Sequence, residues 1–379
     1  MISFNKPYIS GNEIKYIEDS LTRGHISGNG YYTKKCQSLF AHKFKLGKCL
    51  LTTSCTDALE MCAILLDIKE GDEVIMPSYN FVSAANAFIM RGATIKFVDS
   101  NKNHPNLDVT KIRPLINART KVIVIVHYAG VACDMDELVQ LTRDNNLSLV
   151  EDTAHAIGGT FKGKSLGTFG SLATFSFHET KNITSGEGGM LVINDNGLKE
   201  RAEIIWEKGT NRTAFYRGEV DKYRWVDLGS SFLPSELNAA YLLAQLESFD
   251  EIQILRINAW NRYAKGIQSL IDKGHISQLP IPEEEDNLAH MFAFTVKDEA
   301  TRNDLLTFLK AEGVLAVFHY LPLHLSPYYL KLSKVAILPY CESFAKRLVR
   351  LPFYTDISLD IQEFVVNKMI DFFKERTDF

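Results

Sequence analysis

The stretch KVIVIVHYAG, residues 121–130, decides the fold class because it places five consecutive β-branched apolar residues between polar ends. Short, continuous apolar runs are typical of strands that are buried on both faces of a parallel sheet. Similar runs lie along the chain at residues 74–76, 95–98, 147–150 and 173–177. Helix-like stretches precede or separate them, at residues 56–66, 83–90 and 135–145. Strands that alternate with helices in this way predict one large α/β domain with a mainly parallel sheet.

The pattern changes near residue 250. A helical stretch with apolar residues at helical spacing runs from Ser235 to Arg256. Beyond it lie two short apolar runs, at 291–296 and 314–318, and the second of these is interpreted as a strand. Two helix-like stretches also follow, at 305–312 and 359–373. A chain of 379 residues is also too long for one ordinary core, at about 150 residues per domain. We therefore predict a large α/β domain over residues 1–250, with the N-terminal segment included, and a small α+β domain over residues 251–379.

Charge and composition exclude several classes of protein. The chain has 42 basic and 46 acidic residues, a formal net charge of −4, so it lacks the basic excess that nucleic-acid binding requires. No run approaches the roughly 18 to 20 apolar residues that cross a bilayer, and the N-terminus lacks a signal-peptide pattern. The six cysteines form no CxxC pair, and Pro322 breaks any helix between His319 and His324, so no metal site is predicted. We expect a cytoplasmic protein with reduced cysteines and no nucleic-acid or membrane partner.

Polar residues with complementary chemistry follow several of the predicted strands. Ligands bind beyond the carboxyl ends of parallel strands, and there Asp152 ends one run and Lys181 follows the next. Cys55 and Thr56 begin a helix, whose amides can bind a phosphate, and Phe81 offers an aromatic face. Such a set is what pyridoxal phosphate (PLP) requires. Each residue alone has an ordinary explanation, as a helix cap, a core aromatic or a surface lysine, and only their order along the chain favours the cofactor.

Three motifs together resemble a known family. They are Glu151-Asp152-Thr153-Ala154-His155, Phe175-Ser176-Phe177-His178-Glu179-Thr180-Lys181-Asn182 and Gly186-Glu187-Gly188-Gly189. They look like the signature of the DegT-type sugar aminotransferases, PLP enzymes that act on keto groups of nucleotide-linked sugars. The resemblance runs from Asn5 to Pro352, with further matches at residues 28–30, 126–130 and 318–324. It implies the aspartate aminotransferase-like fold, fold type I, with a mainly parallel seven-stranded sheet in the large domain.

The resemblance assigns a role to each matching residue. Lys181 would hold PLP as a Schiff base and move protons, and Asp152 would pair with the pyridinium nitrogen. The remaining cofactor contacts would come from His155 near the ring hydroxyl, Phe81 stacked on the ring, and Ser176, Cys55 and Thr56 at the phosphate. Relatives that carry histidine in place of the Schiff-base lysine become dehydratases. Because Lys181 occupies that position here, transamination is favoured.

Two positions depart from the family pattern. Many relatives have an asparagine at the position of Ser231, where it reaches the phosphate of the neighbouring subunit's cofactor. The serine hydroxyl is shorter, so this contact across the dimer would be weaker or bridged by water. Asn80 stands where a threonine is usual before the stacking aromatic residue. Neither change removes a reacting group.

One region resembles a particular branch of the family. The stretches at 207–212, 221–223 and 228–231 resemble enzymes that make dTDP-4-amino-4,6-dideoxy-D-galactose from dTDP-4-dehydro-6-deoxy-D-glucose. The resemblance implies L-glutamate as amino donor, 2-oxoglutarate as second product and a role in making surface polysaccharide such as O-antigen. An aminotransferase that gives a 3-amino or 4-amino-gluco product remains an alternative.

Two further alternatives belong to other classes of protein. A non-catalytic sensor with the same fold is disfavoured because Lys181 and Asp152 are both retained and no DNA-binding module is added. A nicotinamide-dependent enzyme is disfavoured because no GxGxxG motif follows the first strand.

A nucleotide sugar and a second subunit complete the predicted site. A basic and aromatic stretch supplies the candidates for binding the nucleotide diphosphate: Lys208, Arg212, Arg217 and Lys222, with the aromatic Tyr223 beside them. Further substrate candidates are His319 and Tyr320. Any one of the side chains of this stretch is explained equally well by a place on a solvated surface loop. Loops longer than about a dozen residues are, however, uncommon unless they are functional. Because members of the family are homodimers with shared active sites, we expect a homodimer in which this loop reaches the partner subunit.

Overall fold

The computed structural model describes residues 1–283, 285–333 and 336–375. Its main sheet has seven strands: β1 (Lys48–Thr52), β2 (Glu73–Pro77), β3 (Thr94–Val98), β4 (Thr120–Val126), β5 (Ser148–Asp152), β8 (Leu172–Ser176) and β9 (Gly189–Ile193). They lie in the order β1-β9-β8-β5-β4-β2-β3. Neighbours from β8 to β3 pair in parallel, whereas β9 runs antiparallel to both β1 and β8. The predicted α/β fold with a mainly parallel sheet is confirmed.

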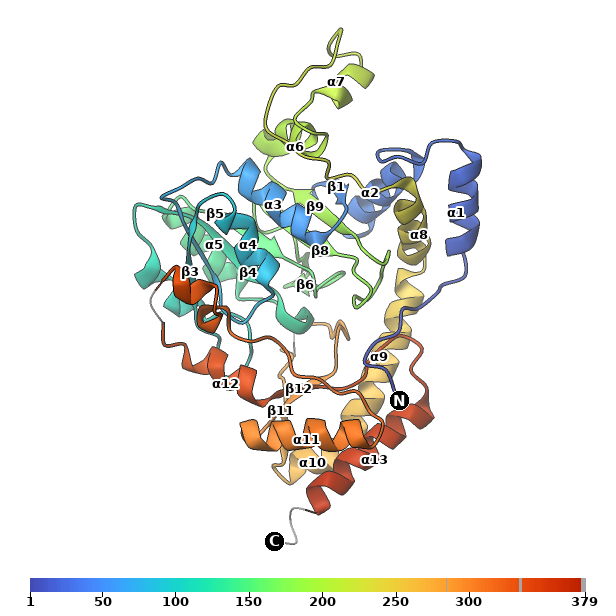
Figure 1. Cartoon of the computed structure of the whole chain (residues 1–379), viewed down its shortest axis with the longest axis vertical. Helices are drawn as coiled ribbons and strands as arrows, with labels where there is room; N and C mark the ends of the chain where they lie inside the picture. The colour runs from blue at the N-terminus through green and yellow to red at the C-terminus, as the bar shows by residue number, and fades with distance from the viewer. Residues whose placement is uncertain (284, 334–335, 376–379) are drawn as a thin grey trace.

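Strand β4, formed by the apolar run at 121–130, shows why helices cover both faces of the sheet. Val122 and Val124 pack on one face and Ile123 and Ile125 on the other, and all four are buried. The first face packs against α3 (Cys55–Leu65), α4 (Val82–Ile89) and α6 (Lys199–Trp206). The opposite face packs against α2 (Tyr31–Lys43), α5 (Met135–Asp144) and α8 (Glu236–Glu247), so helices flank the sheet in Figure 1. The remaining elements of this region are α1 (Glu13–Thr22), which packs on α8, and the hairpin of β6 (Thr160–Phe161) and β7 (Lys164–Ser165).

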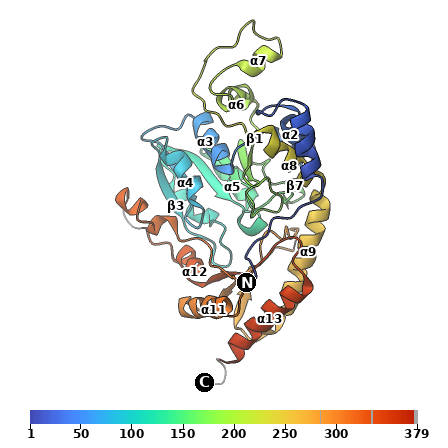
Figure 2. The same cartoon turned by 45° about the vertical axis from the view of Figure 1, so that its right-hand side comes forward.

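A smaller unit follows α8 and occupies the lower part of Figures 1 and 2. Its antiparallel sheet consists of β10 (Ile276–Gln278), β11 (Ala293–Val296) and β12 (Leu348–Arg350). The helices around it are α9 (Phe249–Gly266), α10 (Gln268–Asp272), α11 (Glu299–Ala311), α12 (Pro339–Arg347) and α13 (Leu359–Lys374). The N-terminus lies against this unit, because Ile2 pairs with Val314 and the Phe353 amide donates to the Phe4 carbonyl at 3.0 Å.

Two sequence predictions at the junction of these units are wrong. The helix expected from Ser235 to Arg256 is two helices, α8 and α9, because Ser248 adopts a non-helical conformation (φ −93°, ψ 8°) and caps both of them. Residues 314–318 do not form the expected strand. Val314 pairs with Ile2, whereas Val317 pairs with Arg350. The stretch therefore has no single neighbouring strand with which to form a hydrogen-bonded ladder. The helix expected at 359–373 is confirmed as α13.

An arm, residues 207–231, projects from the end of α6 and carries the short helix α7 (Arg212–Tyr216) at the top of Figures 1 and 2. Its base is closed by backbone pairing between Glu207 and Ser231. The aromatic side chains of Tyr223 and Trp225 stay exposed, by 53% and 81%. Side chains of this kind are costly to leave in water on a projecting segment, so the arm has the character of a contact surface.

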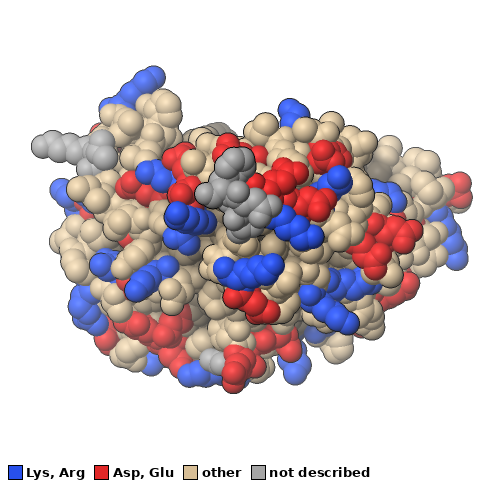
Figure 3. Space-filling model, turned by 90° about the horizontal axis from the view of Figure 1, so that it is seen from below, with Lys and Arg blue, Asp and Glu red and all other residues tan. Residues whose placement is uncertain are grey.

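The surface of the smaller unit carries charges of both signs side by side. Figure 3, a view from below, shows acidic and basic side chains interspersed over this face without a large area of one sign. The pattern agrees with the near balance of 42 basic and 46 acidic residues. Within the described ranges, no helix is long and apolar enough to cross a membrane.

Candidate active site

A cavity of about 780 Å³ lies between the main sheet and the smaller unit. One wall is the carboxyl end of the sheet, where β5 ends at Asp152 and β8 ends at Ser176. We call this the sheet wall. The facing wall comes from residues 290–291, 317–320, 350 and 353, with Phe4 and Asn5 from the N-terminus, and we call it the loop wall. Open parallel sheets bind ligands at this edge, so the cavity is the candidate active site.

Lys181 lines the cavity from a tight turn that follows β8. Its amide donates to the His178 carbonyl at 2.9 Å, which fixes the turn. Among the residues that the structure describes, no hydrogen-bond or ion-pair partner of the Lys181 Nζ is found. Burial lowers the pKa of Lys181 to about 8, and Arg350 adds to this effect, whereas Cys55 and Asp152 oppose it. A buried amine that is partly neutral near pH 8 is suited to attack a carbonyl carbon and to carry protons.

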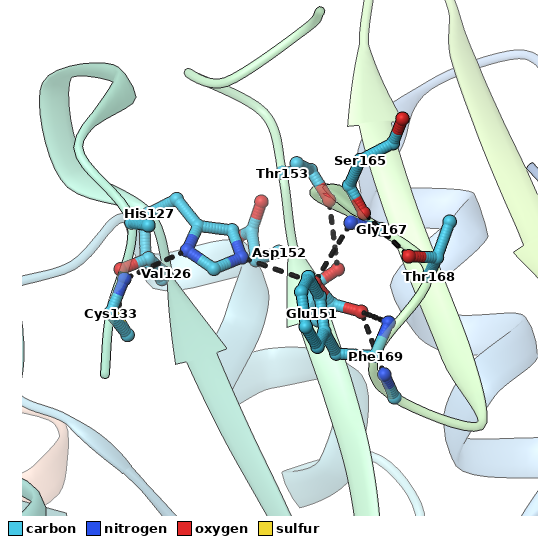
Figure 4. Close-up of polar contacts among 12 residues, drawn as sticks. Val126, His127, Cys133, Glu151, Asp152, Thr153, Ser165, Gly167, Thr168 and Phe169 are labelled. Atoms are coloured by element: carbon cyan, nitrogen blue, oxygen red, sulfur yellow. Dashed lines mark hydrogen bonds and ion pairs between the residues drawn. The ribbon is translucent and has the colours of Figure 1, made fainter. Parts of the chain in front are cut away.

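The last two residues of β5, Glu151 and Asp152, are both acidic, and their side chains point to opposite faces of the sheet. Glu151 is not part of the cavity lining and is fully buried. Its carboxylate accepts three hydrogen bonds of 2.7–2.8 Å from amides of the loop at 167–170. It also lies 3.2 Å from the His127 Nε2 (Figure 4). Glu151 is therefore committed to holding this loop against the sheet.

Asp152 is the carboxylate that faces the cavity. It accepts a hydrogen bond from the Ala154 amide at 3.1 Å. Burial raises the pKa of Asp152, while the Ala154 amide and the charges of Lys181 and His127 partly offset the rise. A buried carboxylate with spare acceptor capacity favours a ligand that brings a protonated nitrogen.

The beginning of α3 provides an anion-binding cradle in the same cavity. Ser54 caps this helix by accepting the Asp57 amide, which leaves the amides of Cys55 and Thr56 in the first turn without an intrahelical acceptor. No hydrogen bond from either amide to a described residue is found. Gly189 lets β9 approach this turn, because a Cβ there would lie 2.4 Å from the Cys55 nitrogen. Free amides at a helix N-terminus fit the phosphate of PLP.

Other predicted cofactor residues complete the sheet wall. Phe81, at the N-cap of α4, lines the cavity and is 57% exposed, so its ring is available for stacking. Ser176 lines the cavity at the end of β8. The buried Asn80 Nδ2 also belongs to this lining and has no hydrogen-bond partner in the described ranges. A buried donor without a partner, together with the free amides of α3, fits a ligand rich in oxygen acceptors.

A group of imidazoles and phenols joins the two walls. His155 stacks on His290 with ring centroids 4.3 Å apart, and His319 stacks on Tyr320 at 3.6 Å. The Tyr128 hydroxyl and the His319 Nδ1 are 2.6 Å apart, which ties the loop wall to the sheet wall. Burial lowers the pKa of each of the three histidines well below its usual value. The histidines therefore line the cavity as neutral rings.

Five predicted site residues do not reach this cavity in a single chain. Arg217 is engaged by two glutamates at 2.7 and 2.8 Å, and Arg212 donates to a tyrosine hydroxyl at 2.9 Å. Both lie on the arm with Lys222 and Tyr223. Ser231 lies at the base of the arm and is exposed. A contribution from these side chains requires a second subunit or a change in the arm.

Sequence reasoning missed two polar residues that the smaller unit contributes to the loop wall, His290 and Arg350. Arg350 interrupts an apolar run, Leu348-Val349-Arg350-Leu351, whose other members are buried. A charge inside a buried strand is a signal that could have identified it. His290 follows an irregular loop, and its neighbours along the chain carry no comparable signal.

Comparisons with known proteins agree with this geometry. The DegT/DnrJ/EryC1/StrS aminotransferase family model matches residues 7–370. The chain is 31% identical to the GDP-perosamine synthase of Escherichia coli O157:H7, over 98% of both chains. It is 30% identical to the spore coat polysaccharide biosynthesis protein SpsC of Bacillus subtilis, over 98% of this chain and 97% of that protein.

Solved structures extend the likeness to the whole fold. The aminotransferase TlmJ of Streptoalloteichus hindustanus superposes with a TM-score of 0.91 at 27% identity, and all of both chains is covered. The Spr1654 protein of Streptococcus pneumoniae, solved in PMP and PLP forms, reaches a TM-score of 0.92 in its PMP form. That match has 26% identity and covers 99% of this chain and 100% of the other. The chain therefore belongs to the DegT/DnrJ/EryC1/StrS aminotransferase family and is a sugar aminotransferase whose cofactor is pyridoxal phosphate.

Proposed function

We propose that this enzyme transfers the amino group of L-glutamate to C4 of dTDP-4-dehydro-6-deoxy-D-glucose. The products would be dTDP-4-amino-4,6-dideoxy-D-galactose and 2-oxoglutarate. The observation that carries the proposal is the presence of two groups in one cavity. They are the Lys181 amine, which has no partner in the described ranges and a pKa lowered to about 8, and the buried Asp152. The stretches at 207–212, 221–223 and 228–231 support this branch of the family. A use in surface polysaccharide is supported by the similarity to SpsC.

The residues of the sheet wall would divide the work. When bound, PLP supplies an aldehyde carbon that captures the donor's amino group and a ring that takes up an electron pair. Lys181 would remove the proton from Cα of glutamate and later deliver a proton to C4 of the sugar. Asp152 would hold the proton on the ring nitrogen. The remaining binding roles go to His155 at the ring hydroxyl, Phe81 on the ring face, and Cys55, Thr56 and Ser176 at the phosphate.

A second candidate differs in the nucleotide. Relatives of this chain in Escherichia coli, Vibrio cholerae and Caulobacter vibrioides, at 31–32% identity, are GDP-perosamine synthases. Their names favour a GDP-linked sugar as an alternative substrate for this enzyme. His319 and Tyr320 line the cavity in either case and would contact the sugar.

A product assay distinguishes these proposals. The purified protein, loaded with PLP, is incubated with L-glutamate and either the dTDP-linked or a GDP-linked 4-keto-6-deoxy sugar. We expect 2-oxoglutarate and an amino sugar with the dTDP substrate, and NMR coupling constants at C4 identify the galacto or gluco product. Lys181→Ala is the control and is expected to lose at least about 10³-fold in rate. Turnover of the GDP substrate alone would contradict the dTDP proposal, and no turnover with any keto sugar would contradict the proposed function.

We further propose a homodimer in which the arm, residues 207–231, contacts the partner subunit. The exposure of Tyr223 and Trp225 on a projecting segment supports this arrangement. Ser231 would then lie near the partner's cofactor phosphate. Mixing Lys181→Ala chains with chains altered at Ser231 tests the arrangement, because shared sites would restore activity in mixed dimers. Mixed dimers without restored activity would contradict shared sites.

We also infer that the chain divides into domains at residues 1–250 and 251–379. The interruption of the helix at Ser248 supports a division close to this point. Separate expression of the two pieces tests the division, because each should show cooperative thermal unfolding by circular dichroism. A piece that stays unfolded would contradict it.

A further inference from the structure

Arg350 lines the cavity and has no role in the chemistry described so far. It is the last residue of β12, in the smaller unit. Its backbone is fixed by two hydrogen bonds with Val317, which donates at 3.0 Å and accepts at 2.8 Å. The side chain therefore begins from a rigid position on the loop wall.

The guanidinium of Arg350 is held in place but is poorly satisfied. Its Cζ lies 4.7 Å from the centre of the Phe4 ring, and its Nη2 donates to the Phe318 carbonyl at a long 3.4 Å. Its Nε is buried and has no hydrogen-bond partner among the residues that the structure describes. Within the described ranges, no carboxylate forms an ion pair with this side chain. Buried arginines are normally paired, so Arg350 has capacity for an anion.

Arg256 shows how the same chain satisfies a buried arginine that has a structural role. Its guanidinium donates to the carbonyls of Ala289 and His290, at 3.0 and 2.7 Å, and to the Thr355 hydroxyl at 3.4 Å. Each nitrogen of Arg256 thus has an acceptor, and the residue does not line the cavity. Arg350 has one long side-chain hydrogen bond to a described residue and faces the cavity. The difference indicates that the missing acceptors of Arg350 come from a ligand.

The charges of the cavity indicate what that ligand is. L-glutamate carries two carboxylates and one ammonium group, so it brings a net negative charge beside the acidic Asp152 and Glu187 of the lining. His155, His290 and His319 are neutral, because burial lowers their pKa. Lys181 is the reacting amine and cannot also hold a carboxylate. Burial lowers the pKa of Arg350 too, but a guanidinium stays protonated in proteins.

We infer that Arg350 binds a carboxylate of the amino donor through the planar fork of its guanidinium. This inference rests on the proposed function, because it assigns the donor site of the same reaction. Two parallel N–H groups match the two oxygens of a carboxylate, which orients the donor as well as holding it. Phe4 would support the opposite face of the guanidinium and limit its motion.

The test measures binding of two dicarboxylates to the PLP-loaded protein by absorption titration. L-glutamate is the reacting probe, and glutarate, which has no amino group, is the non-reacting one. In Arg350→Gln we expect both dissociation constants to rise by about 10- to 100-fold, because a charge-assisted hydrogen-bond pair is lost. Arg350→Lys keeps the charge without the fork and should show an intermediate rise.

Arg302→Gln is the matched control. The Arg302 guanidinium lies 5.6 Å from the Phe318 ring and so contacts the same residue as Arg350, but it does not line the cavity. It should leave both dissociation constants within about twofold of the unaltered protein. Unchanged affinities in Arg350→Gln would overturn the inference. If Arg350→Gln fails to hold PLP, unchanged affinities in Arg350→Lys overturn it.

A failure of the proposed function would give a different result from a failure of the Arg350 assignment. If the proposed function fails, the unaltered protein itself would give no spectral change with L-glutamate and would form no amino sugar. If the unaltered protein does both and the Arg350 variants bind glutarate normally, only the assignment of Arg350 is wrong.

Discussion

The two walls of the cavity differ in how the chain builds them. On the sheet wall, Asp152 and Ser176 end neighbouring parallel strands, and Lys181 follows in a turn only five residues beyond. On the loop wall, His290, the 317–320 segment and Arg350 come from three separate places in the smaller unit. The sheet wall is therefore set by one hydrogen-bonded ladder, whereas the loop wall depends on how the smaller unit packs against the sheet.

The difference separates two tasks. Residues on the sheet wall stand at the ends of strands and the beginnings of helices, so they are suited to hold a cofactor that every reaction cycle uses again. Residues on the loop wall face that cofactor position from the other side and can contact whatever substrate enters. Substitutions on the sheet wall should therefore reduce catalysis itself, and those on the loop wall should alter the affinity for substrates.

The largest expected effect is on the catalytic rate, and it should separate the roles of the two neighbouring carboxylates of β5. Asp152→Asn removes the charge that faces the cavity, and we expect the rate of amino transfer to fall by about 10²- to 10⁴-fold. The free energy of unfolding should change by less than about 1 kcal/mol, because burial already raises the pKa of Asp152. Steady-state kinetics and urea unfolding measure the two quantities.

Glu151→Gln is the matched variant, one residue away and on the opposite face (Figure 4). Its carboxylate accepts three amide hydrogen bonds, and an amide side chain places an N–H group where one of its oxygens accepts. We expect a loss of about 3 kcal/mol of stability with the catalytic rate of the folded protein nearly retained. A rate loss in Glu151→Gln as large as that in Asp152→Asn would contradict the separation of roles.

The second prediction concerns the pH dependence of cofactor attachment. Covalent capture of PLP requires a neutral Lys181, and burial lowers the pKa of this amine to about 8 in the folded protein. Below pH 8 the amine is mostly protonated, and above pH 8 it is mostly neutral. The rate of attachment to the apoprotein should thus rise about tenfold between pH 7 and pH 9 and then level off.

Stopped-flow absorption of the apoprotein mixed with PLP measures this rate. Reaction of PLP with free lysine over the same range corrects for ionisation of the cofactor itself. A rate that keeps rising steeply to pH 10 would mean that Lys181 has an ordinary pKa and that the sheet wall does not desolvate it.

Most of the sheet wall could be predicted from the sequence because strand ends locate its residues. The runs at 147–150 and 173–177 predicted β5 and β8, and residues that end a parallel strand must meet at one edge of the sheet. The cavity accordingly brings together the predicted Cys55, Asp152 and Lys181. Their distance along the chain does not matter once the strand order is known.

The loop wall could not be predicted in the same way. Arg350 reaches the cavity because β12 pairs with β11 and Val317, and this pairing depends on packing between segments more than 30 residues apart. The wrong strand prediction at 314–318 has the same origin, since Val314 and Val317 each find a different partner. Hydrophobic periodicity describes each segment alone and carries no information on which segments pair. The contact between the arm and a partner subunit also remains a prediction, because it involves a second chain.

The smallest expected effect concerns the contact that joins the two walls. Tyr128, from the sheet side, and His319, from the loop wall, meet through a hydroxyl and Nδ1 at 2.6 Å. Tyr128→Phe removes this hydrogen bond and should cost about 1 kcal/mol in the free energy of unfolding. It should also raise the KM for the keto sugar by a few fold, roughly 2 to 5, because His319 is less firmly placed.

Tyr329→Phe provides the comparison that isolates the position of the contact. The Tyr329 hydroxyl donates to the Ile95 carbonyl at 2.9 Å, so it also joins the smaller unit to the main sheet, but it does not line the cavity. Urea unfolding should show a similar loss of about 1 kcal/mol in both variants, since each loses one buried hydrogen bond. Only Tyr128→Phe should change the KM for the keto sugar. Equal KM values in both variants would mean that the loop wall keeps its geometry without this contact, and that packing alone positions His319.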